Sequence, residues 1–182
     1  ALKAYRRAAE LSNSSRGNAV QATQNANIAY ALGSTLNKLG HKSEAQQVFK
    51  DAHAAMPAKS AIAYAYGLML LEQGQANSAL HPLALSLRND PKNPAILFDY
   101  SNALLCTGKQ PQDAENALAQ LLTIDPDHFQ AKALLAEALE VNGKKEAALD
   151  AYNLALNIEN DQDAAWQIRL ISGLGRCALE LG

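Results

Sequence analysis

The stretch ANIAYALGSTLNKLGHKSEAQQVFKDAHAAMPAK, residues 26–59, decides the fold of this chain. Small, large apolar and helix-breaking residues follow one another in it in a fixed order, from Gly33 to Pro57. The same order recurs downstream with a period of about 34 residues. Full copies occupy residues 26–59, 60–93, 94–128 and 129–162, a half-copy occupies residues 163–182, and residues 1–12 match the second half of a copy. We therefore predict a single array of repeated units over residues 1–182.

Each copy is predicted to form a hairpin of two helices. Apolar positions recur at a spacing of about 3.6 residues on either side of a glycine, which is typical of two amphipathic helices joined by a short turn. Glycine ends a helix well because it takes the left-handed backbone conformation without a clash at Cβ. The glycines predicted to end the first helices are Gly40, Gly74, Gly108 and Gly143.

Two further sets of residues have predicted roles in the hairpins. Gly33, Gly67 and Gly175 are predicted to lie where the second helix crosses the first most closely, because a larger side chain would push the helices apart. Proline removes a backbone hydrogen bond from a helix interior but is tolerated in the first turn. The prolines expected to stop the second helices, or to begin the next helix, are Pro57, Pro91 and Pro126.

The order and spacing of these residues resemble the tetratricopeptide repeat family, whose units are about 34 residues long. The resemblance covers nearly the whole chain and implies an all-α fold, a right-handed superhelical solenoid of antiparallel helix hairpins. Armadillo and HEAT solenoids need a longer repeat. The chain departs from the family pattern at its first tryptophan position, which is occupied by Ala29, Ala63, Leu97, Lys132 and Ile171.

The resemblance also implies a function and a site. In this family the first helices line a concave groove, so we expect a non-catalytic scaffold that binds a peptide segment of a partner protein. The groove residues are expected at the inward-facing positions of each first helix. They are Asn27, Tyr30, Ser34, Asn37, Lys38, Tyr64, Leu68, Leu71, Phe98, Asn102, Leu105, Gln130, Glu137, Arg169 and Arg176.

Three aromatic residues occupy the same position in successive copies. Tyr30, Tyr64 and Phe98 are therefore expected to form a ladder along the groove. Flat amphipathic rings bury much area at little entropic cost, which makes them suitable anchors for a bound peptide. The alternative is that these rings fill the space between neighbouring first helices.

Some family members hold the C-terminal carboxylate of a partner with Lys and Asn on successive first helices. This chain has Tyr30 and Ser34 at the corresponding positions of its first copy, so that kind of clamp is not expected. A clamp in another frame, built on Arg169 and Arg176, stays open.

Charge and hydropathy argue against two classes of partner. The chain carries 16 Lys and Arg and 18 Asp and Glu, a net charge of −2, and these residues are dispersed along the sequence. Because a phosphate backbone is bound by a basic stripe, no nucleic-acid partner is expected. No run approaches the roughly 20 apolar residues of a membrane span, so no membrane insertion is expected.

No catalytic residue, cofactor or metal site is expected. Cys106 and Cys177 lack a CxxC spacing and are expected to stay unpaired. Unpaired thiols favour a reducing compartment such as the cytoplasm, while a periplasmic or membrane-tethered location stays open. The histidines lack the spacing typical of metal ligands and are expected to be solvated. They are His41, His53, His81 and His128.

Two alternatives to the groove-binding function stay open. One is that the array is the recognition or oligomerisation arm of a larger enzyme or assembly complex, with the catalytic part outside this chain. We expect flanking sequence because residues 1–12 match a second helix without its first, and residues 163–182 a first helix without its second. The other alternative is that these open ends pair with another copy. The end residues are Leu2 and Tyr5 on one side and Leu174 and Leu181 on the other.

Overall fold

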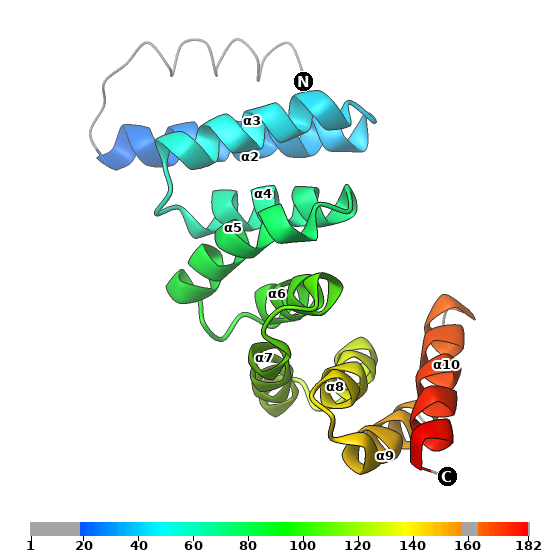
Figure 1. The fold of residues 1–182 in the computed structure, drawn as a ribbon. Coiled ribbons are helices and arrows are strands. Elements are labelled where there is room, and N and C mark those ends of the chain that lie inside the picture. The colour runs from blue at the N-terminus through cyan, green and yellow to red at the C-terminus, as the bar shows by residue number, and fades with distance from the viewer. Residues whose placement is uncertain (1–18, 158–163, 182) are drawn as a thin grey trace. The chain divides into compact units, whose positions relative to one another are not determined.

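The computed structural model describes residues 19–157 and 164–181, and every regular element in these two ranges is a helix. Figure 1 shows the helices following one another as antiparallel pairs, so the predicted all-α array of helix hairpins is confirmed. The helices are α2 (Ala19–Lys38), α3 (Lys42–Ala55), α4 (Ser60–Glu72), α5 (Ala76–Asn89), α6 (Pro94–Thr107), α7 (Pro111–Ile124), α8 (Phe129–Val141), α9 (Lys145–Leu156) and α10 (Ala164–Leu181).

The turns within the hairpins are built on glycine, as predicted. Each of the four turn glycines has a positive φ, a backbone conformation that a Cβ would strain. The values are 82° at Gly40, 72° at Gly74, 63° at Gly108 and 75° at Gly143. The prolines at positions 57, 91 and 126 lie just beyond the ends of α3, α5 and α7, which confirms that they follow the second helices.

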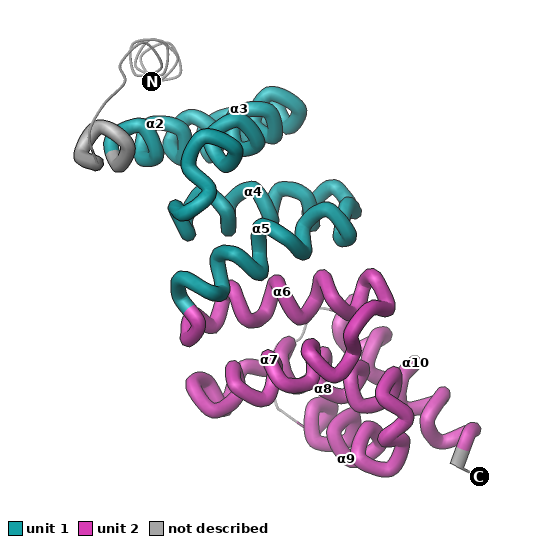
Figure 2. Tube along the Cα trace, turned by 60° about the vertical axis from the view of Figure 1, so that its left-hand side comes forward, with its two compact units in different colours: residues 1–90 teal, residues 91–182 magenta. Residues whose placement is uncertain are grey.

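The chain divides into two compact units, Ala1–Asp90 and Pro91–Gly182, which Figure 2 shows in teal and magenta. In unit 1, α3 packs against both α2 and α4, and α4 packs against α5. In unit 2, α7 packs against α6 and α8, while α10 packs against α8 and α9.

Close helix crossings in unit 1 depend on the absence of a side chain at two glycines. A Cβ at Gly33 would lie 2.6 Å from Cζ of Phe49, and a Cβ at Gly67 would lie 2.6 Å from Cγ of Leu83. Phe49 and Leu83 are both buried. In each hairpin, a large side chain of the second helix therefore packs directly against the backbone of the first helix at a glycine. The predicted role of these two glycines is confirmed.

The corresponding prediction for Gly175 is wrong. No described residue lies within 4 Å of a Cβ at Gly175, whereas a Cβ at Gly173 would collide with the ring of Tyr152. The reason is that α10 meets α8 and α9 through another side, which carries Leu170, Gly173 and Cys177. Gly175 belongs to the side on which the second helix of a further hairpin would pack.

Candidate functional site

An open hollow lies between α2 and α4 in unit 1, and it gathers six of the predicted groove residues. We call it the α2/α4 hollow; it encloses about 550 Å³ when the open space at its mouth is included. The predicted residues in its wall are Tyr30, Ser34, Asn37, Lys38, Tyr64 and Leu68, and the others are Phe49, Ala65, Met69 and Glu72.

Helix periodicity explains why these residues share a wall. Tyr30, Ser34 and Lys38 are spaced four residues apart on α2, so they lie one above another on one side of the helix. Tyr64 and Leu68 have the same spacing on α4, which packs beside α2. The two helices therefore present matching rows of side chains to the space between them.

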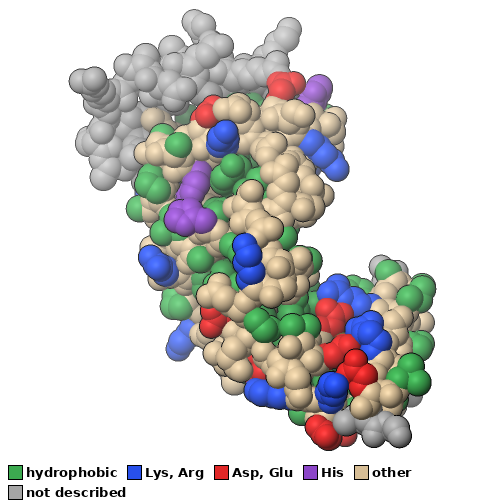
Figure 3. Space-filling model, viewed as in Figure 1, with side chains coloured by type: hydrophobic (Ala, Val, Ile, Leu, Met, Phe, Trp, Pro, Cys, Tyr) green, Lys and Arg blue, Asp and Glu red, His purple; other side chains and the backbone are tan. Residues whose placement is uncertain are grey.

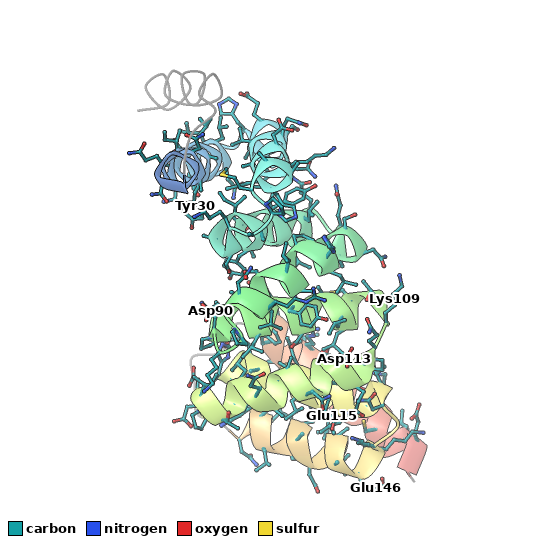
Figure 4. The ribbon with its side chains drawn as sticks, turned by 90° about the vertical axis from the view of Figure 1, so that its left-hand side faces the viewer. Tyr30, Asp90, Lys109, Asp113, Glu115 and Glu146 are labelled. Carbon is teal, nitrogen blue, oxygen red and sulfur yellow. The ribbon has the colours of Figure 1, made fainter. Side chains whose placement is uncertain are left out.

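A second, smaller hollow adjoins the first at Tyr30. It is lined by Ala26, Asn27, Tyr30, Lys59, Ser60, Ala61 and Ile62, and it brings in the predicted groove residue Asn27. Tyr30 lines both hollows and remains 46% exposed. Its ring meets that of Phe49 in an edge-to-face arrangement, with 6.3 Å between ring centres. Figure 4 shows Tyr30 on the side of α2 next to α4. Its ring therefore lies at the centre of one continuous surface.

Polar groups stand around the apolar part of the α2/α4 hollow. Met69 is buried and Leu68 is half-buried, while Lys38 and Glu72 are exposed. Asn37 donates a hydrogen bond of 3.4 Å from Nδ2 to Glu72 Oε2, which joins α2 to α4. The hollow thus offers an apolar floor with both signs of charge in its wall. Leu71, also on α4, is half-buried and lines neither hollow.

The third ring of the predicted ladder lies in the other unit. Phe98, on α6, stacks on the imidazole of His128 with 5.2 Å between ring centres. His128 is the N-cap of α8 and accepts a hydrogen bond from the backbone N–H of Ala131. Tyr30 and Tyr64 thus share one hollow, whereas Phe98 has its own stacking partner, and a continuous ladder stays a prediction.

Three more predicted groove residues lie on α6 and α8. Asn102 accepts a hydrogen bond from the thiol of Cys106 over 3.7 Å, within the same helix. Leu105, one turn further along α6, is half-buried. Gln130 is half-buried at the start of α8. All three keep part of their surface accessible.

The two predicted groove arginines are paired with carboxylates of the neighbouring first helix. Arg169 on α10 donates to both oxygens of Glu137 on α8, with 2.6 Å between Nη2 and Oε2. Arg176 donates to both oxygens of Glu140 at 2.7 and 2.9 Å. Figure 3 shows acidic and basic side chains side by side over α8 and α10. A carboxylate clamp built on these arginines would have to displace two bidentate pairs.

Glu140 is also held by Tyr152, whose hydroxyl donates a hydrogen bond of 2.6 Å to Oε2. Burial alone would raise the pKa of the Glu140 carboxyl, but the hydrogen bonds from Arg176 and Tyr152 and the charge of Arg176 outweigh it. The pKa of Glu140 therefore lies below its usual value. Burial and the hydrogen bond to Glu140 raise the pKa of Tyr152 far above its usual range, so the phenol stays protonated as the donor.

A contact between two histidines in unit 1 was not anticipated from the sequence. The ring of His53 on α3 lies 5.7 Å from Tyr66 and 6.4 Å from His81 on α5, between ring centres. His53 is half-buried, and its Nδ1 is buried without a hydrogen-bond partner among the described residues, so the expectation of a solvated side chain is wrong for this residue. Burial and, to a lesser extent, the charge of His81 lower the pKa of His53.

The described residues hold neither a metal-binding cluster nor a helix that could span a membrane. Within residues 19–157 and 164–181, no three His, Cys, Asp or Glu side chains gather in a way that would hold a metal ion. None of the described helices has the length and apolar content needed to cross a membrane. Cys106 is exposed and Cys177 is buried, and neither forms a disulfide.

Comparisons with known proteins agree on the fold. The family model described as tetratricopeptide repeat matches residues 30–94 and 101–165. A crystal structure of MamA superposes with a TM-score of 0.70 at 18% identity, covering 83% of this chain and 85% of that one. A tetratricopeptide repeat protein from Parabacteroides merdae superposes with a TM-score of 0.69 at 16% identity, covering 87% of this chain and 59% of that one. No curated protein sequence matches the chain.

Proposed function

Because this chain belongs to the tetratricopeptide repeat family, we propose that it is a protein-interaction scaffold that binds a peptide segment of a partner in the α2/α4 hollow. The observation that carries the proposal is that Tyr30 and Tyr64 line the same open hollow. Aromatic side chains in a partly apolar pocket are the usual anchors of protein interfaces because they bury much area for few rotatable bonds.

The composition of the hollow favours a peptide over a small apolar ligand. The floor at Leu68 and Met69 would take an apolar side chain, while Asn37 and Ser34 place polar groups beside it that suit a peptide backbone. Lys38 and Glu72 lie within the same wall and would interact with charged residues on either side of the anchor. The expected partner segment is therefore apolar at its centre and polar at its flanks.

Selection of random displayed peptides on the purified chain tests this function. We expect enriched peptides whose binding falls by about 30-fold in Tyr30→Ala or Tyr64→Ala, since truncation of an interface anchor costs about 2 kcal/mol. Leu39→Ala is the control, because Leu39 lies in the turn directly after α2 and is 57% exposed but lines neither hollow.

Unfolding measurements on the same variants separate binding from packing. Tyr30 is 46% exposed, so its truncation should lower the melting temperature little. A large loss of stability in Tyr30→Ala with unchanged peptide affinity would favour the packing role of the ring. Enriched peptides that bind both tyrosine variants as tightly as the unaltered chain would place the site elsewhere.

Self-association is a second proposed activity, and one observation on α10 favours it. Ile168, Ile171 and Leu179 are 65%, 59% and 86% exposed on this helix. Apolar side chains gathered on one surface element are typical of interaction sites. Leu174, expected to lie at an uncovered end, is half-buried against the cluster of α8, α9 and α10, so the exposed residues beside it carry the proposal.

A further inference from the structure

We propose that the α2/α4 hollow binds an extended segment in which an acidic and a basic residue are direct neighbours, the acid facing Lys38 and the base facing Glu72. This inference rests on the proposed function and adds the backbone conformation of the partner segment, its charge pattern and the register of the charges against the apolar anchor. It depends on the walls of the hollow, on its volume and on the ion pairs that other first helices form.

The two charges stand opposite each other at one end of the hollow. Lys38 is the last residue of α2 and Glu72 is the last residue of α4. Both line the hollow and both are exposed. A segment that lies between the two helices would therefore have a cation on one side and an anion on the other.

The fold leaves these two charges unpaired. Within residues 19–157 and 164–181, neither Lys38 nor Glu72 forms an ion pair. Glu72 accepts a hydrogen bond from Asn37 on Oε2, and at 3.4 Å that bond is long. Both charges are thus open to a partner of complementary sign.

The first helices of unit 2 show the contrary arrangement. Glu137 on α8 is paired with Arg169 on α10. Glu140 on α8 is paired in the same way with Arg176. A charged segment bound there would have to displace these pairs, whereas a segment in the α2/α4 hollow would meet charges that hold no such partner.

The volume of the hollow favours an extended segment over a helix. The hollow encloses about 550 Å³ when the open space at its mouth is included. Two turns of α-helix, about 11 Å long and 10–12 Å across, would fill roughly 850–1,200 Å³, so a helix would enter only in part. An extended segment is narrower and can pass between α2 and α4.

An extended backbone determines the order of the partner's charges. Successive side chains of an extended chain point to opposite sides. A residue that faces α2 is therefore followed by one that faces α4. The acid opposite Lys38 and the base opposite Glu72 should accordingly be neighbours in the partner sequence.

The apolar floor determines the register. Leu68 and Met69 form the floor, and Glu72 follows Leu68 by about one turn of α4, or about 6 Å along the helix axis. An extended chain advances about 3.3 Å per residue, so the charged pair should begin about two residues from the anchor. The expected segment has an apolar anchor, one spacer residue and then the two opposite charges, in either chain direction.

Charge reversal in the full chain tests the inference on synthetic copies of peptides selected from a random displayed library. Lys38→Glu and Glu72→Lys should each weaken binding about fivefold, because attraction at an exposed pair becomes repulsion. Lys42→Glu and Glu146→Lys are the matched controls. They change the net charge equally at exposed positions that line neither hollow, and should leave the affinity unchanged.

Exchange of charge between chain and peptide gives the decisive result. A peptide whose acid is replaced by lysine should regain its affinity for Lys38→Glu and not for Glu72→Lys, because only the first variant has changed the sign of the α2 wall. Insertion of one alanine between the acid and the base should weaken binding to the unaltered chain, since it turns both charges toward the same wall. These changes to the peptide leave the fold of the chain untouched.

The outcomes separate this inference from the proposed function. Peptides that lose affinity in Tyr30→Ala and Tyr64→Ala but respond to the charge reversals no more than to the controls would overturn the charge assignment and leave the proposed function standing. Equal rescue in both reversed variants, or tolerance of the inserted alanine, would overturn the extended register. A selection that enriches no peptide would overturn the proposed function and this inference together.

Discussion

The hydroxyl of Tyr152 on α9 donates a hydrogen bond of 2.6 Å to the carboxylate of Glu140 on α8. The same carboxylate receives two hydrogen bonds from Arg176 on α10, so three helices of unit 2 meet at one side chain. Tyr152 is fully buried and its ring also lies against Gly173. This junction positions α10, which carries the exposed apolar residues Ile168, Ile171 and Leu179.

Tyr152→Phe is expected to lower the free energy of unfolding by about 1 kcal/mol, because it removes one hydrogen bond to a carboxylate and keeps the ring. Urea unfolding followed by the fluorescence of Trp166 measures it, since Trp166 is the single tryptophan and packs against the core of α8, α9 and α10. Tyr66→Phe is the control, because the Tyr66 hydroxyl makes no hydrogen bond among the described residues. Equal losses in both variants would contradict a role for the bond.

Protonation of Glu140 should loosen the junction at acid pH. Because the pKa of Glu140 is lowered in the folded state, its contribution to stability is present above the unfolded value of 4.5 and is lost as pH falls through the folded value. The unaltered chain should therefore lose stability below about pH 4.5. Glu140→Gln should lose about 1–2 kcal/mol at pH 7, since Arg176 is partly exposed, and should lose less than the unaltered chain on acidification. Parallel pH profiles for the two proteins would refute this assignment.

Alanine at two glycines of α10 should have opposite effects. At Gly173 the new Cβ would collide with Tyr152, and we expect a loss of about 1–3 kcal/mol from the overpacked contact. At Gly175 the space is open, and we expect a gain of about 0.5–1 kcal/mol from the better helix propensity of alanine. Thermal unfolding at a concentration low enough to keep the chain monomeric compares the two. Destabilisation by both substitutions would mean that Gly175 is covered.

The histidine contact in unit 1 predicts a second pH dependence, near neutrality. The pKa of His53 is lowered in the folded state, so stability is full above the unfolded value of 6.5 and falls as pH drops through the folded value. His53→Phe should melt at a temperature that changes less than that of the unaltered chain between pH 7.5 and pH 5.5. Phenylalanine also removes the buried Nδ1, which has no hydrogen-bond partner in the part of the chain that the structure describes. An unchanged difference between the two pH values would show that another group titrates.

Local structure could be predicted from the sequence because each copy of the repeat carries its own turn, helix-end and crossing signals. The turn glycines, the prolines past the second helices and the crossings at Gly33 and Gly67 all follow from the repeated order of residues. The prediction for Gly175 was wrong because a crossing needs a second helix, which the pattern of one helix does not supply.

Contacts between neighbouring hairpins within each compact unit were harder to predict. His53 meets Tyr66 and His81 because α3, α4 and α5 converge there, and their spacing in the sequence gives no sign of it. The pair of Arg169 and Glu137 could have been found, since both were predicted on the groove side of neighbouring first helices with opposite charges.

The bidentate pairs between α8 and α10 restrict how this array can be rearranged. Glu137 and Glu140 stand at positions that hold Asn102 and Leu105 in α6. If α10 were transplanted to follow the α6 hairpin, both arginines would meet neutral side chains and two ion pairs would be lost. The ion pairs between α8 and α10 thus specify which helix can follow the α8 hairpin. Genetic duplication or shuffling of hairpins would have to preserve this match of charges.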